Sequence, residues 1–291
     1  MQAISRVILS HGGPDPAAAP GARPAIIATR VDAVRAADPI VASTFTSLTA
    51  HVAEVAATNH AWMTFYRGQR VDWRNRAGHT SVLPSIFRPE RGKQRLSGTT
   101  LKARLTELDR AIHLLQAHWR TLRSPNPLWR FREYAVALIQ HYELCPTPMV
   151  DLTTSLHVAA SFARGDDGLG DGVVYVIAMP YPHETISLYP HLGLSLARLQ
   201  PLVPPDALRP QFQEAWLAGR LPISAERSAG DDLAGRVIAK YALPAGAAFW
   251  DGAFQPLLQR ALLPPDDPFG ETLRRLVKPA EPSPDGAAPP T

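Results

Sequence analysis

Residues 140–155, QHYELCPTPMVDLTTS, set the pattern for the middle of the chain. A helical pattern covers residues 131–142, and Pro146 and Pro148 prevent its continuation, because proline lacks an N–H and biases its predecessor toward extended backbone. Met149 and Val150 then read as a short buried strand, and residues 156–163 as a second helix. Polar and titratable side chains therefore crowd where a helix gives way to a strand and the strand to another helix.

The start of that second helix carries a carboxylate and a run of hydroxyls. Asp151, Thr153, Thr154 and Ser155 precede it directly. Such side chains can cap free N–H groups, and the same helix end can attract an anion such as a phosphate. The residues alone leave both alternatives open: an ordinary capped helix, or part of a binding site.

The rest of the chain reads as a mixture of helices and strands. Helices are expected where Phe45, Leu48, Val52 and Val55 recur at helical spacing and after residues 98–100, where an apolar stripe indicates core packing. Strands are expected at 62–67, ending in a turn at Gly68, and at 172–179. Beyond residue 180 the expectations are helical pieces at 195–199 and 210–218 and an extended piece at 236–242. The pattern predicts an α+β fold.

Length and composition indicate how the chain is divided into domains. The 291 residues allow one large domain, expected over 41–278 between a linker-like extension at 1–40 and a disordered tail at 279–291. The net charge of +4 is mildly basic. A single cysteine, Cys145, excludes an internal disulfide and suits the cytoplasm; its position favours a buried side chain over a nucleophile. No apolar run approaches the roughly 20 residues that span a membrane, and the spacing of His113 and His118 argues against a metal site.

Several separated blocks resemble the FRG domain. They are FYRGQ at 65–69, LPSIFR at 83–88, the 140–155 stretch, and DGVVY at 171–175. Their order and spacing fit over roughly residues 60–180. The chain departs from the family pattern at Glu143, which stands where glycine is usual, and at Pro148 and Leu152, which stand for arginine and tryptophan; Cys145 looks inserted.

The hydroxyl run has a second resemblance, to the Ser-Thr-Ser element of ADP-ribosyltransferases. Those enzymes also place an arginine on an early strand and a glutamate near a late one. The resemblance implies a small mixed or antiparallel sheet with surrounding helices, and NAD as the substrate. It assigns catalytic roles to Arg67, Thr154 and Ser155, and offers Glu214 or Gln213 for the late glutamate position, Glu214 as a catalytic and Gln213 as a binding residue. Gln69, His141, Asp151 and Thr153 are expected to have binding roles.

The residues themselves keep other interpretations of this site open. Arg67 is suited to hold a phosphate or carboxylate bidentately, or to form a structural ion pair with Asp151. His141 is a candidate donor to a ribose hydroxyl or proton carrier, or a structural helix residue. Asp151 is expected to orient one of them, and Gln69 can both donate to and accept from a hydroxyl-rich ligand.

Three functions follow as hypotheses. The first is an ADP-ribosyltransferase-like enzyme or toxin of bacterial conflict or phage defence, whose acceptor is a protein or nucleic acid; this role comes from the resemblance, and the bacterial origin from Ala-, Arg- and Pro-rich usage. The second is a non-catalytic module that binds a nucleotide or a protein. The third is a nucleic-acid-directed protein, suggested by the basic balance alone. The basic segment 88–95 is interpreted as a solvated loop.

Overall fold

The computed structural model describes residues 7–10, 26–93, 95–122, 130–220, 231–252 and 254–278. Most of the expected linker at 1–40 and the expected tail at 279–291 lie outside these residues. The helices are α1 (Val31–Ala36), α2 (Phe45–Thr58), α3 (Gly98–Thr121), α4 (Arg132–His141), α5 (Leu156–Arg164), α6 (Leu208–Phe212), α7 (Gln259–Leu262) and α8 (Pro268–Val277). The strands are β1 (Val7–Ser10), β2 (Ile26–Thr29), β3 (Ile40–Val41), β4 (Met63–Gln69), β5 (Met149–Thr153), β6 (Gly172–Met179), β7 (Ile186–Tyr189), β8 (Leu194–Arg198), β9 (Ala215–Arg220) and β10 (Val237–Leu243).

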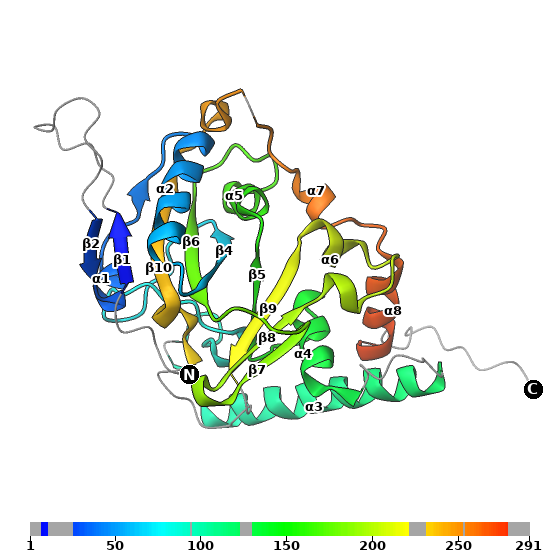
Figure 1. The fold of residues 1–291 in the computed structure, drawn as a ribbon. Helices are drawn as coiled ribbons and strands as arrows, with labels where there is room; N and C mark the ends of the chain where they lie inside the picture. The colour runs from blue at the N-terminus through cyan, green and yellow to red at the C-terminus, as the bar shows by residue number, and fades with distance from the viewer. Residues whose placement is uncertain are drawn as a thin grey trace, which may run out of the picture.

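Eight of these strands form one sheet in the order β3-β10-β6-β4-β5-β9-β8-β7 (Figure 1). Every neighbouring pair in this sheet is antiparallel except β3 and β10, which are parallel. β1 and β2 form a separate antiparallel hairpin. The predicted α+β class with a mixed sheet is confirmed.

The sheet consists of two halves that barely join. β4 pairs with β6 over seven residues and β5 pairs with β9 over five, but β4 and β5 share only the pair Tyr66 and Thr153. Past that pair the two strands diverge, and the backbone groups of β5 that face β4 need other partners, because unpaired backbone polar groups are costly to bury. The opening between the halves lies toward the start of β5, near Asp151, whereas Thr153 and the hydroxyls that follow it lie at the end where β4 and β5 pair.

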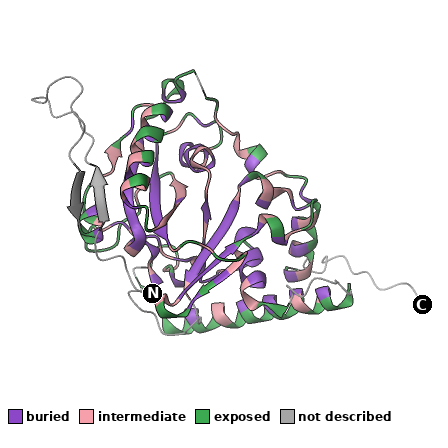
Figure 2. Cartoon of the chain, in the orientation of Figure 1, coloured by how far each residue is buried: buried purple, intermediate pink, exposed green. Residues whose placement is uncertain are grey.

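Two hydrophobic clusters form the core. One contains buried residues of α1, α2 and α5 and of strands from both halves of the sheet, β4, β6 and β10 as well as β5, β8 and β9. The other joins α3, α4 and α8 to β5, β8 and β9. Figure 2 shows the buried strands inside and exposed residues along the outer side of the long helix α3. The apolar stripe of α3 is core packing, as predicted: Leu108, Ile112 and Leu115 are fully buried.

Helix α5 lies so close to β4 and β6 that two glycines are required. A Cβ on Gly68 would lie 1.8 Å from the carbonyl oxygen of Ala159, and one on Gly172 would lie 2.0 Å from that of Ala163. The expected turn at Gly68 is wrong, because β4 continues through it to Gln69. Gly68 serves the close approach of a helix to the sheet.

The structure corrects two further expectations. Residues 195–199 do not form a helical piece, since Leu194–Arg198 is strand β8. Residues 210–218 divide between the end of α6 and strand β9. Both strands are buried between sheet neighbours, so tertiary packing overrides their weak local preference. The body of the fold also begins before residue 41, because Val31 and Val34 of α1 are buried in the core.

Candidate functional site

Arg67 bridges the opening between the two halves of the sheet. Its Nη1 donates to the main-chain oxygen of Asp151 at 2.7 Å, so a side chain satisfies a carbonyl that a continuous ladder would have paired. Burial lowers the pKa of Arg67, and the charge of Asp151 opposes that shift. Its Nε is buried without a hydrogen-bond partner. Arg67 therefore contacts Asp151 as expected, but through the backbone instead of a carboxylate pair.

The carboxylate of Asp151 instead faces helix α4. It accepts from His141 Nδ1 at 3.0 Å and from Gln140 Nε2 at 2.8 Å. Burial alone would raise the pKa of Asp151, but the hydrogen bond and charge of His141 and the charge of Arg67 hold it below the usual range of a carboxyl. His141 is completely buried. Asp151 thus contacts both residues that it was expected to orient, Arg67 through its main-chain oxygen and His141 through its carboxylate. These contacts join β4, β5 and α4 in one polar cluster.

The end of α4 explains one departure from the family pattern. Leu144 N–H donates to the Ile139 oxygen and Glu143 N–H to the Gln140 oxygen, each at 3.0 Å. This is the hydrogen-bond pattern of a helix end whose first residue past the cap is left-handed. That residue is Glu143, with φ of 54°. A glycine there adopts this conformation without strain, so the substitution changes the local energy and leaves the turn in place.

Of the hydroxyls of Thr153, Thr154 and Ser155, that of Ser155 caps helix α5, and that of Thr153 holds the N–H of this cap residue. Thr153 Oγ1 accepts from the N–H of Ser155 at 3.0 Å, and Ser155 Oγ accepts from the N–H of Val158 at 3.3 Å. Thr153 is buried, whereas Thr154 and Ser155 are half-buried. The hydroxyl of Thr154 is directed elsewhere, since its Oγ1 donates to Glu214 Oε2 at 3.3 Å. Within this run of hydroxyls, Ser155 therefore caps a helix and Thr154 contacts a carboxylate.

Glu214 stands directly before β9, the strand that the sequence did not reveal. Its φ of 46° is left-handed, which is uncommon for a residue with a side chain and costs backbone energy. Its neighbour Gln213 is buried and donates from Nε2 to the Leu262 oxygen at 2.7 Å. Of these two candidates for the late carboxylate position, Glu214 faces the hydroxyl run, and Gln213 ties β9 to α7.

Arg67, Thr154 and Glu214 belong to or adjoin three adjacent strands, β4, β5 and β9. Phe65 and Trp216 pack edge-on across the sheet face at 5.1 Å between ring centroids. Arg67 lies two residues after Phe65 and so shares its face. Glu214 lies two residues before Trp216 on a strand parallel to β4. The register places Tyr66, Thr153 and Ala215 in one row across the sheet, with Arg67 one residue after this row and Glu214 one residue before it. Two residues of strand therefore separate Arg67 from Glu214, or about 7 Å along the strand direction.

Gln69, the last residue of β4, leads to a cavity of about 870 Å³. Its Oε1 is buried without a hydrogen-bond partner. The lining of the cavity comes mostly from irregular segments: residues 73–77, and Ser81, Leu83, Arg88, Pro89 and Arg95. The sequence does not reveal this cavity, because such segments have no periodic pattern and the basic segment reads as a solvated loop. An unusual density of arginine around an isolated tryptophan, Trp73, was the available signal.

A buried ionic network holds the wall of that cavity in place. Asp72 accepts from Lys240 Nζ at 3.1 Å, from Thr80 Oγ1 at 2.7 Å and from the Tyr175 hydroxyl at 2.9 Å. Although burial opposes charge on Asp72, these hydrogen bonds lower its pKa; burial raises the pKa of Tyr175. The residues lie on separate segments of the chain, so only the folded chain assembles them.

The thiol of Cys145, the placement of possible metal ligands and the character of the helices bear on what the described part of the chain can do. Cys145 is buried, and burial raises the pKa of its thiol to about 12, which is unlike a nucleophile. Within the residues that the structure describes, no group of three or more His, Cys, Asp or Glu side chains is placed to hold a metal ion. Over the same ranges, no helix has both the length and the apolar character needed to cross a bilayer.

Comparison with known proteins identifies one domain. Residues 63–168 match the model of the FRG domain. This match lies within the 60–180 region over which the sequence blocks resemble that family, so the resemblance is confirmed there. The matched residues include Arg67, the 140–155 stretch and helix α5. No curated protein and no solved structure matches the chain.

Proposed function

We propose that this chain, which carries an FRG domain over residues 63–168, cleaves NAD and transfers ADP-ribose to a macromolecular acceptor. One observation carries the proposal: the hydroxyl of Thr154 lies 3.3 Å from the carboxylate of Glu214, beside the strand that carries Arg67. The setting of bacterial conflict or phage defence rests on the resemblance to the transferases. The acceptor is a protein or a nucleic acid.

The arrangement supports a division of labour between Arg67 and Glu214. A dinucleotide is an extended ligand with anionic phosphates at its centre and a reactive ribose at one side. Arg67, whose Nε has no partner, holds a phosphate or ribose oxygen. Glu214 lies about 7 Å away along the strand direction, the rise of two residues of strand in the register of β4, β5 and β9. Thr154 fixes the carboxylate of Glu214 by its hydrogen bond.

The reaction breaks the bond between the nicotinamide nitrogen and C1′ of its ribose. Nicotinamide leaves with the electron pair, positive charge develops on the sugar, and a nucleophile of the acceptor forms a new bond to C1′ as it loses its proton. The carboxylate of Glu214 stabilises the positive charge and accepts a hydrogen bond from the 2′-hydroxyl. Ser155 caps α5 and so keeps Thr154 in place.

Nicotinamide release from NAD, with and without cell extract, tests this proposal. Glu214→Gln keeps the size of the side chain and removes its charge, so release is expected to fall by about a hundredfold to a thousandfold while NAD binding persists. Glu184→Gln is the matched control, because Glu184 is exposed and lies away from the hydroxyl run. Equal release by wild type and Glu214→Gln, or none by folded wild type under either condition, would refute it.

A non-catalytic nucleotide- or protein-binding module is the second candidate. Two observations favour it. The hydroxyls of Thr153 and Ser155 bind backbone N–H groups at the start of α5, and Arg67 uses Nη1 to satisfy a backbone carbonyl. This function predicts saturable NAD binding by calorimetry without any nicotinamide release. It also predicts that Glu214→Gln binds NAD as the wild type does.

A further inference from the structure

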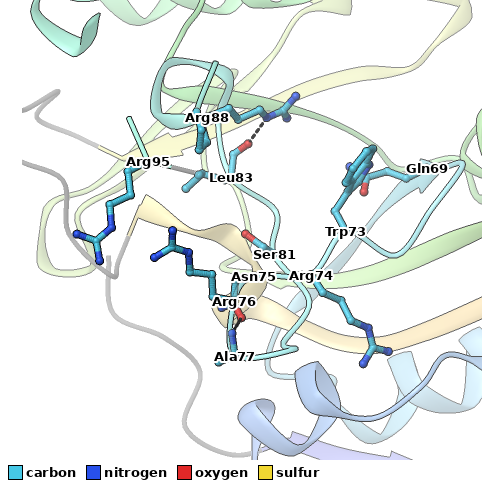
Figure 3. A pocket seen from close by; sticks show the side chains of 11 residues that line it. Gln69, Trp73, Arg74, Asn75, Arg76, Ala77, Ser81, Leu83, Arg88 and Arg95 are labelled. Atoms are coloured by element: carbon cyan, nitrogen blue, oxygen red, sulfur yellow. Dashed lines mark hydrogen bonds between the residues drawn. The ribbon is translucent and has the colours of Figure 1, made fainter. Parts of the chain in front are cut away.

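The cavity beside Gln69 has a strongly positive lining. Arginines 74, 76, 88 and 95 line it, and neither Asp nor Glu is among its lining residues. Arg74 is committed elsewhere, since its Nη2 lies 2.8 Å from Asp38 and 3.0 Å from Asp72, and Figure 3 shows it pointing away from the other arginines. None of the ion pairs among the described residues contains Arg88 or Arg95, although the charge of Asp151 acts on Arg88. The lining thus offers cationic groups to an anionic ligand.

The positive charge of Arg67 acts on Arg88. Its Nε donates to the Leu83 oxygen at 2.8 Å, which fixes the side chain beside the cavity (Figure 3). Burial and the charge of Arg67 lower the pKa of Arg88, and the charge of Asp151 opposes that shift. Two guanidinium groups and one carboxylate leave a net positive charge, so a further anion beside Arg88 is favoured. A phosphate is the anion whose geometry suits an arginine fork best.

The cavity also carries an aromatic surface. Trp73 is 63% exposed, and Figure 3 shows its ring beside Gln69, across the cavity from Arg95. Its backbone is fixed, because its oxygen accepts from Ser81 N–H at 2.8 Å and the adjacent Asp72 is anchored in the buried network. A large exposed ring on a rigid segment is a platform for stacking a base. Gln69 adds an unpartnered oxygen that can accept from a base or ribose.

From this cavity we infer a binding site for a nucleotide that carries two or more phosphates. Arg88 and Arg95 bind the phosphates, and Trp73 stacks on the base. The volume of about 870 Å³ falls within the range of small-molecule sites, which favours a free nucleotide over a polymer. The inference does not rest on the proposed NAD cleavage, since it uses neither Thr154 nor Glu214.

Calorimetric titration with ADP at low salt tests the site. Wild type is expected to bind ADP more tightly than pyrophosphate or adenosine, because each probe lacks one of the two contacts. Arg88→Gln and Arg95→Gln are expected to weaken ADP binding by about tenfold to a hundredfold each, as the loss of a charged hydrogen bond implies. Trp73→Ala is expected to abolish the advantage of ADP over pyrophosphate.

Two further variants serve as controls for this site. Arg91→Gln removes a neighbouring exposed arginine that does not line the cavity, and it should leave ADP binding unchanged. Glu214→Gln should also bind ADP as the wild type does, even if it releases no nicotinamide. No ADP binding by folded wild type, or equal loss in Arg91→Gln and Arg88→Gln, would overturn the inference. Binding of a short single-stranded oligonucleotide that ADP does not displace would overturn it in favour of a nucleic-acid surface.

Discussion

Replacing Gly68 with alanine tests why glycine follows Arg67. The added Cβ would lie 1.8 Å from the oxygen of Ala159 and 2.7 Å from the nitrogen of Ala163. Both atoms belong to the backbone of α5, so no side-chain rotation relieves the clash. The helix would have to move by roughly 1 Å or more from a face on which Ala159, Ala160 and Ala163 are fully buried. Overpacking against backbone in this way is expected to cost about 3 kcal/mol or more.

Thermal unfolding monitored by circular dichroism measures this cost. For a chain of this size, about 3 kcal/mol corresponds to a fall in Tm of roughly 6–12 °C. Gly98→Ala is the matched control, because a Cβ there meets nothing within 4 Å and Gly98 begins helix α3, where alanine is favoured. It should leave Tm unchanged or raise it slightly. A Gly68→Ala protein that melts within about 2 °C of wild type would refute the argument from close packing.

Three further predictions use single side chains. The hydrogen bond and charge of His141 lower the pKa of Asp151 against the opposing effect of burial, so its contribution to stability is present above the unfolded pKa of about 4 and is lost as pH falls through the folded pKa. Asp151→Asn should therefore make the free energy of unfolding, measured with urea, depend less on pH in the acid range. An unchanged dependence on pH would contradict this. Glu143→Gly should raise stability by about 1 kcal/mol, because it relieves a left-handed residue and removes only an exposed ion pair with Arg209; a lower midpoint of urea unfolding would count against it. With its pKa raised to about 12 by burial, Cys145 should react with iodoacetamide at pH 8 about a thousandfold more slowly than an unperturbed thiol until the chain unfolds, so rapid alkylation of folded protein would exclude the buried state.

Local pattern was sufficient for the elements with strong periodicity or clear end signals. The apolar stripe of α3, the β-branched run of β6 and the proline stop after α4 each carry their signal within a short window, and all three elements are found where expected. The hydroxyl of Ser155 caps α5, as a residue of that type before a helix predicts.

Elements that depend on their neighbours were not predictable in the same way. Strand β8 was expected to be helical, because its identity comes from pairing with β7 and β9 on both sides. Glu214 directly precedes strand β9, whose pairing with β5 brings it to the hydroxyl run; the sequence indicates the residue but expects helix over 210–218 and so misses the strand that positions it. Gly68 was read as a turn because the helix that requires it lies about ninety residues later in the chain.

Residue type, order and short spacing were enough to establish the α+β class, the FRG blocks and the set of polar residues from which a site is built. Which of those residues meet depended on the packing of the chain. Packing directs Arg67 to the backbone of Asp151, Thr154 to Glu214 and Gln213 away to Leu262. It also gathers Trp73, Arg88 and Arg95 around one cavity. These contacts join segments far apart in the chain, and their distances are fixed only when the two half-sheets and their helices pack together.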